Sequence, residues 1–234
     1  MKTKLALLIM VLISLAASAA LAGPSPSEPR FGGVLRATIN SNPASLDPVL
    51  EGGENEQIPA GHIFETALTT GLEGSVYAGV CTYEVKNDGK TIELTLRDGV
   101  KFHDGSTVSI DDVKASADRW LANVNFAKSH VGKKLERLET VDNKLIFTFK
   151  EPAPLALTAI STWDRGLYIV PKSVCEKYPN SKIENDDLVG TGPYAFKDYQ
   201  VGRFVLLEKF KEYVPYESGG SGLAEAKQGY VDTL

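Results

Sequence analysis

A chain of 234 residues with 43% hydrophobic and 24% charged positions has the composition of a globular protein, which excludes a largely disordered chain. The formal net charge of −5 excludes the basic field that attracts phosphate backbones or anionic membrane surfaces, so we expect no nucleic-acid partner. The two cysteines form no CxxC pair and the three histidines are scattered, so we expect neither a metal site nor a cofactor.

The first 22 residues have the pattern of an export signal. Lys2 and Lys4 give a positive start, residues 5–17 are almost entirely apolar, and small residues stand at Ala20 and Ala22. A membrane anchor is the alternative, but the apolar run is too short to span a bilayer comfortably and a Pro-containing segment follows it. We therefore predict cleavage after Ala22 and a periplasmic or secreted protein that is not inserted in the membrane.

The segment after the signal begins with a linker and a strand. Residues 23–30 are rich in proline and serine and predict a linker. Alternating apolar and polar residues over 34–39 predict a strand, and 40–48 form a polar loop. Residues 63–68 place apolar side chains at helical spacing and predict a short helix.

The middle of the chain predicts a β-hairpin. Two alternating segments, 81–85 and 91–97, flank an Asn-Asp-Gly turn at 87–89. Three apolar residues of the second segment share one face: Ile92, Leu94 and Leu96. That face is expected to lie on the core.

Two Asp-Gly turns, at 98–99 and 104–105, follow the hairpin. The residues between and around them are expected to form a surface turn with local hydrogen bonds and no catalytic role: Lys101, His103 and Asp104. Ser109 and Asp112 resemble a capping box, which predicts a helix over 110–121.

Further elements follow along the chain. Residues 138–141 and 145–149 predict a second hairpin, 155–160 a buried helix, 173–177 a helical turn, and 204–209 a strand. This mixture of hairpins and helices indicates an α+β or mixed α/β architecture. Before the last strand, two glycines are expected where the backbone passes close to its neighbours: Gly190 and Gly192.

Cys81 and Cys175 would meet an oxidising compartment after export. They could form a disulfide if the fold brings their Cβ atoms together. Two separate buried thiols are the alternative, and the sequence leaves both open.

Three segments carry a family resemblance. They are DGKTIELTLRDGVKFHDGSTVSIDDVKASADRW at 88–120, GTGPYAF at 190–196 with Lys-Glu-Tyr at 211–213, and SLDP at 45–48. Together, and in their order along the chain (45–48, 88–120, 190–196), they resemble the family 5 extracellular solute-binding proteins of ABC importers, the class that binds peptides and nickel.

The resemblance implies a mixed α/β fold of the periplasmic-binding-protein type II, in the large cluster with an extra β-rich subdomain. It assigns 31–48 and 188–234 to the core of the first lobe and 49–187 to the inserted β-rich subdomain. Family members are roughly twice as long as this chain. We therefore expect the second lobe to be missing and the sequence to be a truncated form or part of a split gene.

Candidate ligand-binding residues follow by position in the resemblance. Five belong to the first-lobe loop that approaches the ligand: Ser41, Asn42, Pro43, Ala44 and Ser45. Trp163 falls in a cleft-lining stretch and could stack on a ligand or pack in the core. Asp164 could meet the ammonium group of a peptide or be a solvated loop carboxylate.

The resemblance implies an exported, monomeric solute-binding component that traps a peptide or small polar solute between two lobes and presents it to the membrane permease of an ABC importer. A receptor-linked sensory binding module is the alternative, as is a non-functional fragment. An enzyme is not expected, because the sequence offers no nucleophile with an adjacent base and no paired carboxylates.

Overall fold

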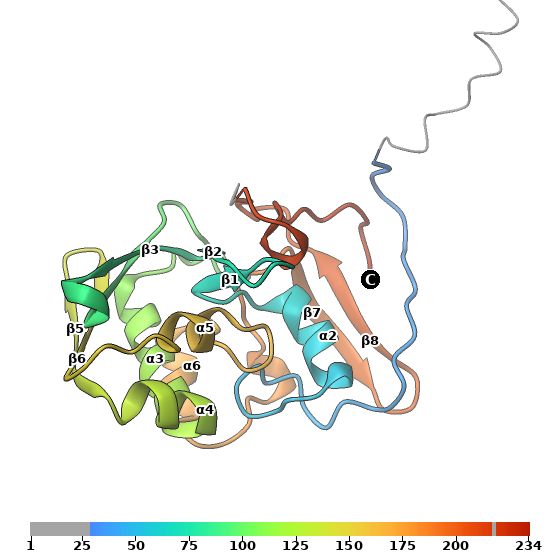
Figure 1. Cartoon of the computed structure of the whole chain (residues 1–234). Helices are drawn as coiled ribbons and strands as arrows, with labels where there is room; N and C mark the ends of the chain where they lie inside the picture. The colour runs from blue at the N-terminus through green and yellow to red at the C-terminus, as the bar shows by residue number, and fades with distance from the viewer. Residues whose placement is uncertain (1–28, 217–218) are drawn as a thin grey trace, which may run out of the picture.

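A computed structural model describes residues 29–216 and 219–234, so the predicted signal at 1–22 lies outside the described residues. Figure 1 shows a β-sheet with several helices at one end of the molecule and a two-stranded sheet with one helix at the other. Within the described part of the chain, no helix combines the length and apolar character needed to cross a membrane.

The larger sheet has four antiparallel strands in the order β3-β4-β6-β5. The strands are β3 (Cys81–Lys86), β4 (Thr91–Leu96), β5 (Leu135–Val141) and β6 (Lys144–Phe149). Both predicted hairpins are confirmed. At the first turn Asn87 and Asp88 have φ of 52° and 53°, the left-handed conformation that these residue types tolerate.

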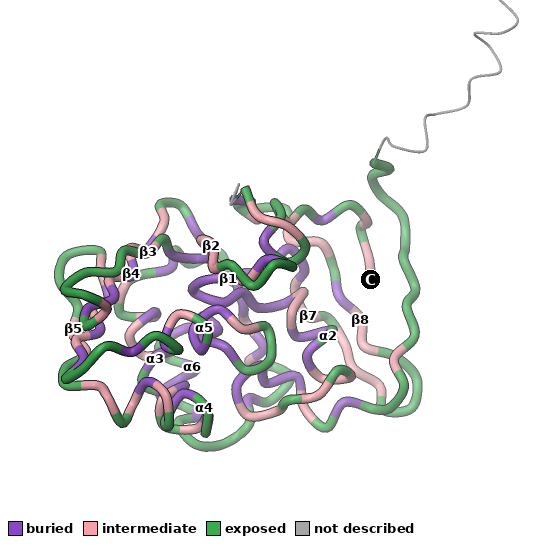
Figure 2. The backbone as a smooth tube through the Cα atoms, viewed as in Figure 1, coloured by how far each residue is buried: buried purple, intermediate pink, exposed green. Residues whose placement is uncertain are grey.

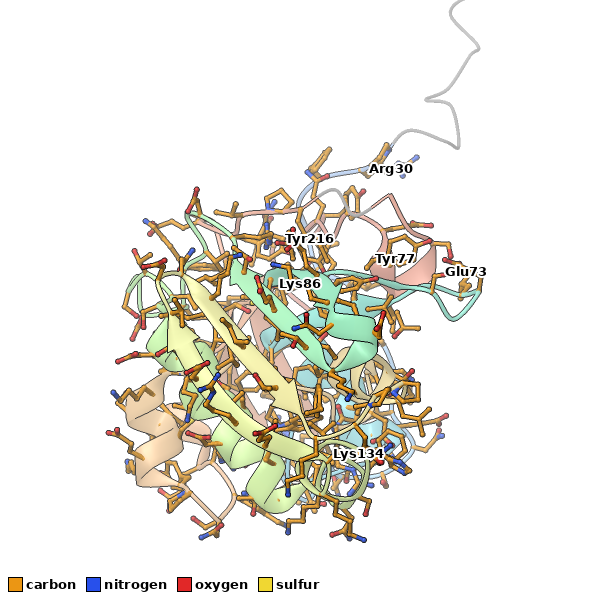
Figure 3. All side chains as sticks on the ribbon, turned by 60° about the vertical axis from the view of Figure 1, so that its left-hand side comes forward. Arg30, Glu73, Tyr77, Lys86, Lys134 and Tyr216 are labelled. Carbon is orange, nitrogen blue, oxygen red and sulfur yellow. The ribbon has the colours of Figure 1, made fainter. Side chains whose placement is uncertain are left out.

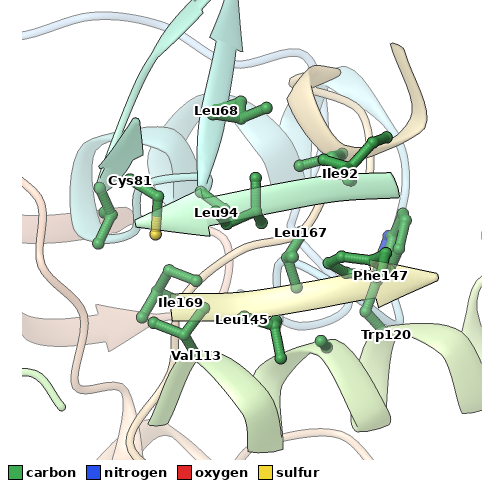
Figure 4. Packing of buried hydrophobic residues seen from close by; sticks show 14 of the residues in the cluster. Leu68, Cys81, Ile92, Leu94, Val113, Trp120, Leu145, Phe147, Leu167 and Ile169 are labelled. Carbon is green, nitrogen blue, oxygen red and sulfur yellow. The ribbon is translucent and has the colours of Figure 1, made fainter. Parts of the chain in front are cut away.

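One face of this sheet carries the first core. The helices on it are α3 (Ile110–Asn123), α4 (Asn125–Ala127) and α5 (Ala156–Ser161), and a π-helical turn, Lys128–Gly132, follows α4. Figure 4 shows Val113 and Trp120 of α3 packed beneath the strands that bear Leu94, Leu145 and Phe147. The other face is polar, and Figure 3 labels Lys86 at its end. Glu93 pairs with Lys86 and with Lys144, with 2.8 Å between the charged atoms of each pair.

The predicted capping box of α3 is confirmed. The Ser109 hydroxyl accepts from the Asp112 amide at 3.3 Å, and the Asp112 carboxylate accepts from the Ser109 amide at 2.8 Å. These bonds satisfy two of the donors that a helix start leaves open.

A second core lies around the two-stranded sheet. Its elements are α2 (Glu54–Ile63), α6 (Lys172–Lys177), β7 (Tyr194–Gln200) and β8 (Phe204–Lys209). The buried residues include Leu46, Ile63, Phe64, Val174, Tyr178 and Leu207. The helix predicted over 155–160 and the helical turn over 173–177 are confirmed as α5 and α6, and the strand over 204–209 as β8.

A short hairpin, β1 (Leu68–Thr70) and β2 (Val76–Ala78), packs on the first core through Leu68 and Val76. At its tip Glu73 accepts a hydrogen bond from the Tyr77 hydroxyl (Figure 3). Two 3₁₀ turns, Asn185–Asp187 and Gly222–Ala224, complete the elements beyond α6.

Two predicted elements are wrong. Residues 34–39 form no strand, because the segment makes one isolated bridge, between Val34 and Thr233, and its residues are mostly exposed (Figure 2). The helix predicted over 63–68 is absent, because α2 ends at Ile63, the first residue of that range. Phe64 is already extended, and Thr66 instead bridges Tyr168, so pairing with a distant segment overrides the local helical spacing.

The predicted close approach of the backbone at Gly190 and Gly192 is confirmed. A Cβ atom at Gly190 would lie 2.1 Å from the Ile63 carbonyl oxygen, and one at Gly192 would lie 2.3 Å from that of His62. The Gly192 amide also donates to the Ile63 carbonyl at 2.8 Å. A side chain at either glycine would push the segment 190–192 away from the end of α2.

His103 corrects the expectation of purely local bonding in its turn. Its ring nitrogen lies 2.9 Å from the Gly192 carbonyl oxygen, and its amide donates to the Gly190 carbonyl at 3.0 Å. Burial lowers the pKa of the imidazole. Asp104 does bond locally, to Ser106. Two of the segments that carry the family resemblance are therefore in direct contact.

Candidate functional site

The predicted ligand loop is held on one side by the start of α2. The Asn55 side-chain oxygen accepts from the amides of Asn40 at 2.8 Å and Ser41 at 3.3 Å. The Glu56 carboxylate accepts from the Ala44 amide at 3.2 Å. The loop is therefore fixed through its own backbone.

The turn between β7 and β8 holds the loop on its other side. The Tyr199 hydroxyl donates to the Pro43 carbonyl at 2.8 Å, and the Asn42 side-chain oxygen accepts from the Gly202 amide at 2.7 Å. These partners lie more than 150 residues along the chain from the loop. The five predicted residues are thus brought into one rigid segment, as a preorganised binding loop requires.

A buried ion pair fixes the end of the loop. Asp47 and Arg119 meet through two hydrogen bonds of 3.2 and 2.5 Å, and their side chains are 0% and 2% exposed. The Asp47 carboxylate also accepts from the Ile183 amide, and Arg119 donates to the Tyr178 carbonyl. The sequence analysis gave no role to this pair, which ties the loop to α3 and to the chain after α6.

Ala44 and Ser45 also line an open hollow of about 420 Å³. The other residues that line it are Lys182, Ile183, Glu184, Asn185, Asp186 and Tyr199. Ser45 accepts from the Asp47 amide at 3.1 Å, so its hydroxyl proton stays available to a second acceptor.

Trp163 is 45% exposed, so the interpretation that it packs in the core is wrong. The Tyr168 hydroxyl donates to its carbonyl at 2.6 Å, which fixes the backbone under the exposed ring. The Asp164 side chain is 51% exposed and lies 3.5 Å from Arg165 Nε, as a solvated loop carboxylate does.

The two groups of predicted residues adjoin the same segment. Within the described residues, no hydrogen bond joins Trp163 or Asp164 to the loop at 41–45. The loop is bonded to Asn55 and Glu56, and two residues close to Trp163 and Asp164 in sequence reach the same segment, 47–57. Arg165 lies against Gly52, and the Tyr168 hydroxyl donates to Gln57 at 3.4 Å. The predicted ligand-binding residues therefore form two separate parts, and the segment 47–57 connects the loop with the chain beside Trp163 and Asp164.

A buried polar cluster lies elsewhere and was not anticipated. Glu65 and Thr191 are each 1% exposed. Among the described residues, one side-chain oxygen of each and one terminal nitrogen of Arg97 are buried without a hydrogen-bond partner. Tyr213 donates to the other Glu65 oxygen at 2.8 Å, and Arg97 stacks on Tyr216 at 4.5 Å. Burial raises the pKa of the Glu65 carboxyl.

Cys81 and Cys175 are free thiols, which decides against a disulfide. Cys81 lies in the first core and Cys175 in the second. Burial raises their pKa values to about 12 and about 11. In residues 29–216 and 219–234, no group of three or more histidine, cysteine or acidic side chains is placed to hold a metal ion.

Comparison with known proteins gives a consistent result. Residues 75–233 match the family described as bacterial extracellular solute-binding proteins, family 5 Middle. The probable peptide ABC transporter periplasmic-binding protein y4tO of Sinorhizobium fredii is 26% identical over 94% of this chain and 42% of its own length. The glutathione-binding protein GsiB of Salmonella typhi is 35% identical over 56% of this chain and 25% of its own length.

Solved structures share the fold. AgaA from A. tumefaciens R10, in complex with agropinic acid, superposes with a TM-score of 0.65 at 27% identity, over 76% of this chain and 36% of that one. DppA from Helicobacter pylori, in complex with the peptide STSA, superposes with a TM-score of 0.69 at 22% identity, over 87% of this chain and 42% of that one. The chain thus spans less than half the length of these relatives.

Proposed function

Because the chain belongs to the family 5 bacterial extracellular solute-binding proteins, we propose that it forms one wall of the ligand site in the binding component of an ABC import system. The relatives are solute-binding proteins and not enzymes. The match over residues 75–233, on a fold that covers about two fifths of each solved relative, is the observation that carries the proposal.

The proposed cargo is a short peptide or a polar solute of similar size. The names of two relatives refer to peptide and to glutathione, and one related structure holds a tetrapeptide. Fold alone does not select a cargo, so this step rests on the relatives and on the wall itself.

The proposed wall consists of the loop at 41–45 with Trp163 and Asp164. The loop is held by hydrogen bonds on both sides, and such preorganisation lowers the entropy lost on binding. Trp163 offers an exposed aromatic face beside a carboxylate. A second lobe that closes over this wall would bury the ligand and create the surface that a permease recognises.

Peptide titration of the processed protein, from residue 23 onward, tests the proposal. Trp120 is fully buried, whereas Trp163 is exposed, so a ligand on the wall changes the fluorescence of Trp163. We expect a saturable change with a mixture of tri- and tetrapeptides, at micromolar to millimolar concentrations because one wall supplies only part of the contacts.

Two variants make the result specific. Trp163→Phe should lose the signal, and Phe126→Leu, which alters another exposed aromatic residue on α4, should keep it. Absence of a saturable response to the peptide mixture, by fluorescence and by calorimetry, would remove the proposal.

A further inference from the structure

We infer that Arg165 is a specificity-determining residue of this wall and that the part of the ligand it meets carries a carboxylate. The inference rests on the proposed solute-binding function. Its grounds are the backbone conformation of Arg165, the glycine beneath its side chain, and the hydrogen-bonding capacity that the guanidinium leaves unused.

The backbone of Arg165 is held in an unfavourable conformation. It has φ of 55°, and the other described non-glycine residues with positive φ are Asn87, Asp88 and Asp142, all in hairpin turns. Asparagine and aspartate tolerate this region because their short side chains bond locally, an advantage that arginine lacks. An arginine kept at such a position suggests a role for its side chain.

Neighbouring groups hold this conformation firmly. The indole nitrogen of Trp120 donates to the Arg165 carbonyl at 3.0 Å, and Trp120 is fully buried. The next residue is Gly166, where a Cβ atom would lie 2.1 Å from the Thr162 carbonyl oxygen. Contacts with the core therefore fix this turn, and the turn sets the position of the Arg165 side chain.

That position is beside the backbone of Gly52, in the segment that joins the two parts of the wall. A Cβ atom at residue 52 would lie 2.3 Å from Arg165 Nε and 2.6 Å from Cζ. Because Gly52 has no side chain, the guanidinium can lie directly on the backbone of the segment 47–57, with one face against Gly52.

The guanidinium keeps most of its donors free. Its only ion pair among the described residues is with Asp164, with 3.5 Å between Nε and Oδ1, and neither terminal nitrogen makes a hydrogen bond within the described chain. The side chain is 43% exposed. Its planar pair of donors matches a carboxylate, which can accept two parallel hydrogen bonds.

The neighbours favour a singly charged group over phosphate. Asp164 places a negative charge beside Arg165, so the pair has little net charge and would repel one of the two charges of a phosphate. Trp163 lies two residues before Arg165 and adds an exposed aromatic face. A carboxylate next to an apolar or ammonium-bearing part of the ligand fits this arrangement.

The test compares tripeptides as free acids with the same tripeptides as C-terminal amides, by calorimetric titration of the processed protein. We expect the free acids to bind about tenfold more tightly, as one charge-assisted pair supplies. Arg165→Asn should bind acid and amide equally, and its stability should be retained because asparagine tolerates the backbone conformation.

A matched control and the other outcomes separate the possibilities. Arg137→Gln removes a charge from the exposed side of β5 and should keep the preference for acids. Equal binding of acids and amides by the wild type, or an unchanged preference in Arg165→Asn, overturns the inference and leaves the proposed function standing. Stronger competition by inorganic phosphate than by acetate also overturns it. If neither form binds, the proposed function fails, and the inference with it.

Discussion

Arg119 donates four hydrogen bonds from a fully buried guanidinium, two of them to Asp47. A buried charge that loses its partner keeps its desolvation cost without the compensating attraction. We therefore predict that Arg119→Met lowers the free energy of unfolding by about 3–5 kcal/mol. In the double variant with Asp47→Asn, part of this loss should be recovered, as urea denaturation would measure.

Lys172→Met is the control for that prediction. Lys172 pairs with Asp111 at 3.2 Å, but both side chains are exposed, so its loss should cost less than about 1 kcal/mol. If Arg119→Met were no more destabilising than this control, the buried pair would not be what holds the ligand loop to α3.

Glu65 gives the molecule a pH dependence of known sign. Burial raises the pKa of its carboxyl in the folded state, so its ionisation opposes folding. Below the unfolded-state pKa of about 4.3, the stability contributed by the protonated Glu65 carboxyl is fully present. It is lost as the pH rises through the pKa of this carboxyl in the folded state. Glutamine does not ionise, so the Glu65→Gln variant does not lose this stability. The free energy of unfolding of the variant minus that of the wild type should therefore increase from pH 4 to pH 8.

Urea denaturation of both proteins across this pH range would measure the effect. Glu136→Gln, at an exposed position on β5, is the control and should give a difference that does not change with pH. A flat difference for Glu65→Gln as well would show that the buried carboxyl does not control the pH dependence.

At the scale of single elements, the start of α3 depends on Ser109. Removing its hydroxyl takes one of two acceptors from the Asp112 amide and the hydroxyl donor from the Asp112 carboxylate, so Ser109→Ala should cost about 1 kcal/mol of stability. Ser173→Ala is the matched control, since Ser173 is exposed in α6 with no side-chain hydrogen bond in the described structure, and it should change stability by less than about 0.5 kcal/mol. Equal effects of both changes in urea denaturation would contradict a capping role.

The elements that sequence reasoning predicted correctly are the ones that local chemistry determines. The Asn-Asp-Gly turn at 87–89 and the capping box at Ser109 specify their structures within a few residues. The segment at 34–39 alternates like a strand but finds only one bridging partner, Thr233, at the far end of the chain. β7 was missed although it forms a hairpin with the predicted β8, because a register shift between Phe196 and Asp198 interrupts its alternation. Whether a segment forms a strand depends on a pairing partner that can lie far away in the sequence, and local patterns do not encode that partner.

The candidate site divides in the same way. The loop at 41–45 was predicted from the resemblance, whereas its anchors are Tyr199 at the end of β7 and Gly202 in the turn after it, which only the tertiary fold brings near. Arg165 was missed because a positive φ at arginine has no signature in composition or periodicity. The glycine that it covers, Gly52, looked like an ordinary loop residue.

The whole molecule has two hydrophobic cores, and α3 belongs to both. Val113 and Trp120 face the sheet of the first core. On another side of the helix, the Ser116 hydroxyl donates to the Val170 carbonyl and accepts from its amide, at 3.0 and 2.9 Å. The Asp47–Arg119 pair joins the same regions. Because breaking either core would expose one face of α3, we expect the two cores to unfold together.

Cys81 and Cys175 report on this coupling, one in each core. Raised pKa values and burial should keep both thiols unreactive toward a disulfide reagent in the native protein. Single-thiol variants, Cys81→Ala and Cys175→Ala, allow each remaining thiol to be followed during labelling in low urea. After correction for reactivity in the unfolded chain, the two rates should agree within about fivefold, or about 1 kcal/mol in opening free energy. Labelling of Cys175 more than tenfold faster would instead mean that the second core opens alone while the four-stranded sheet stays folded, so that α3 does not couple them.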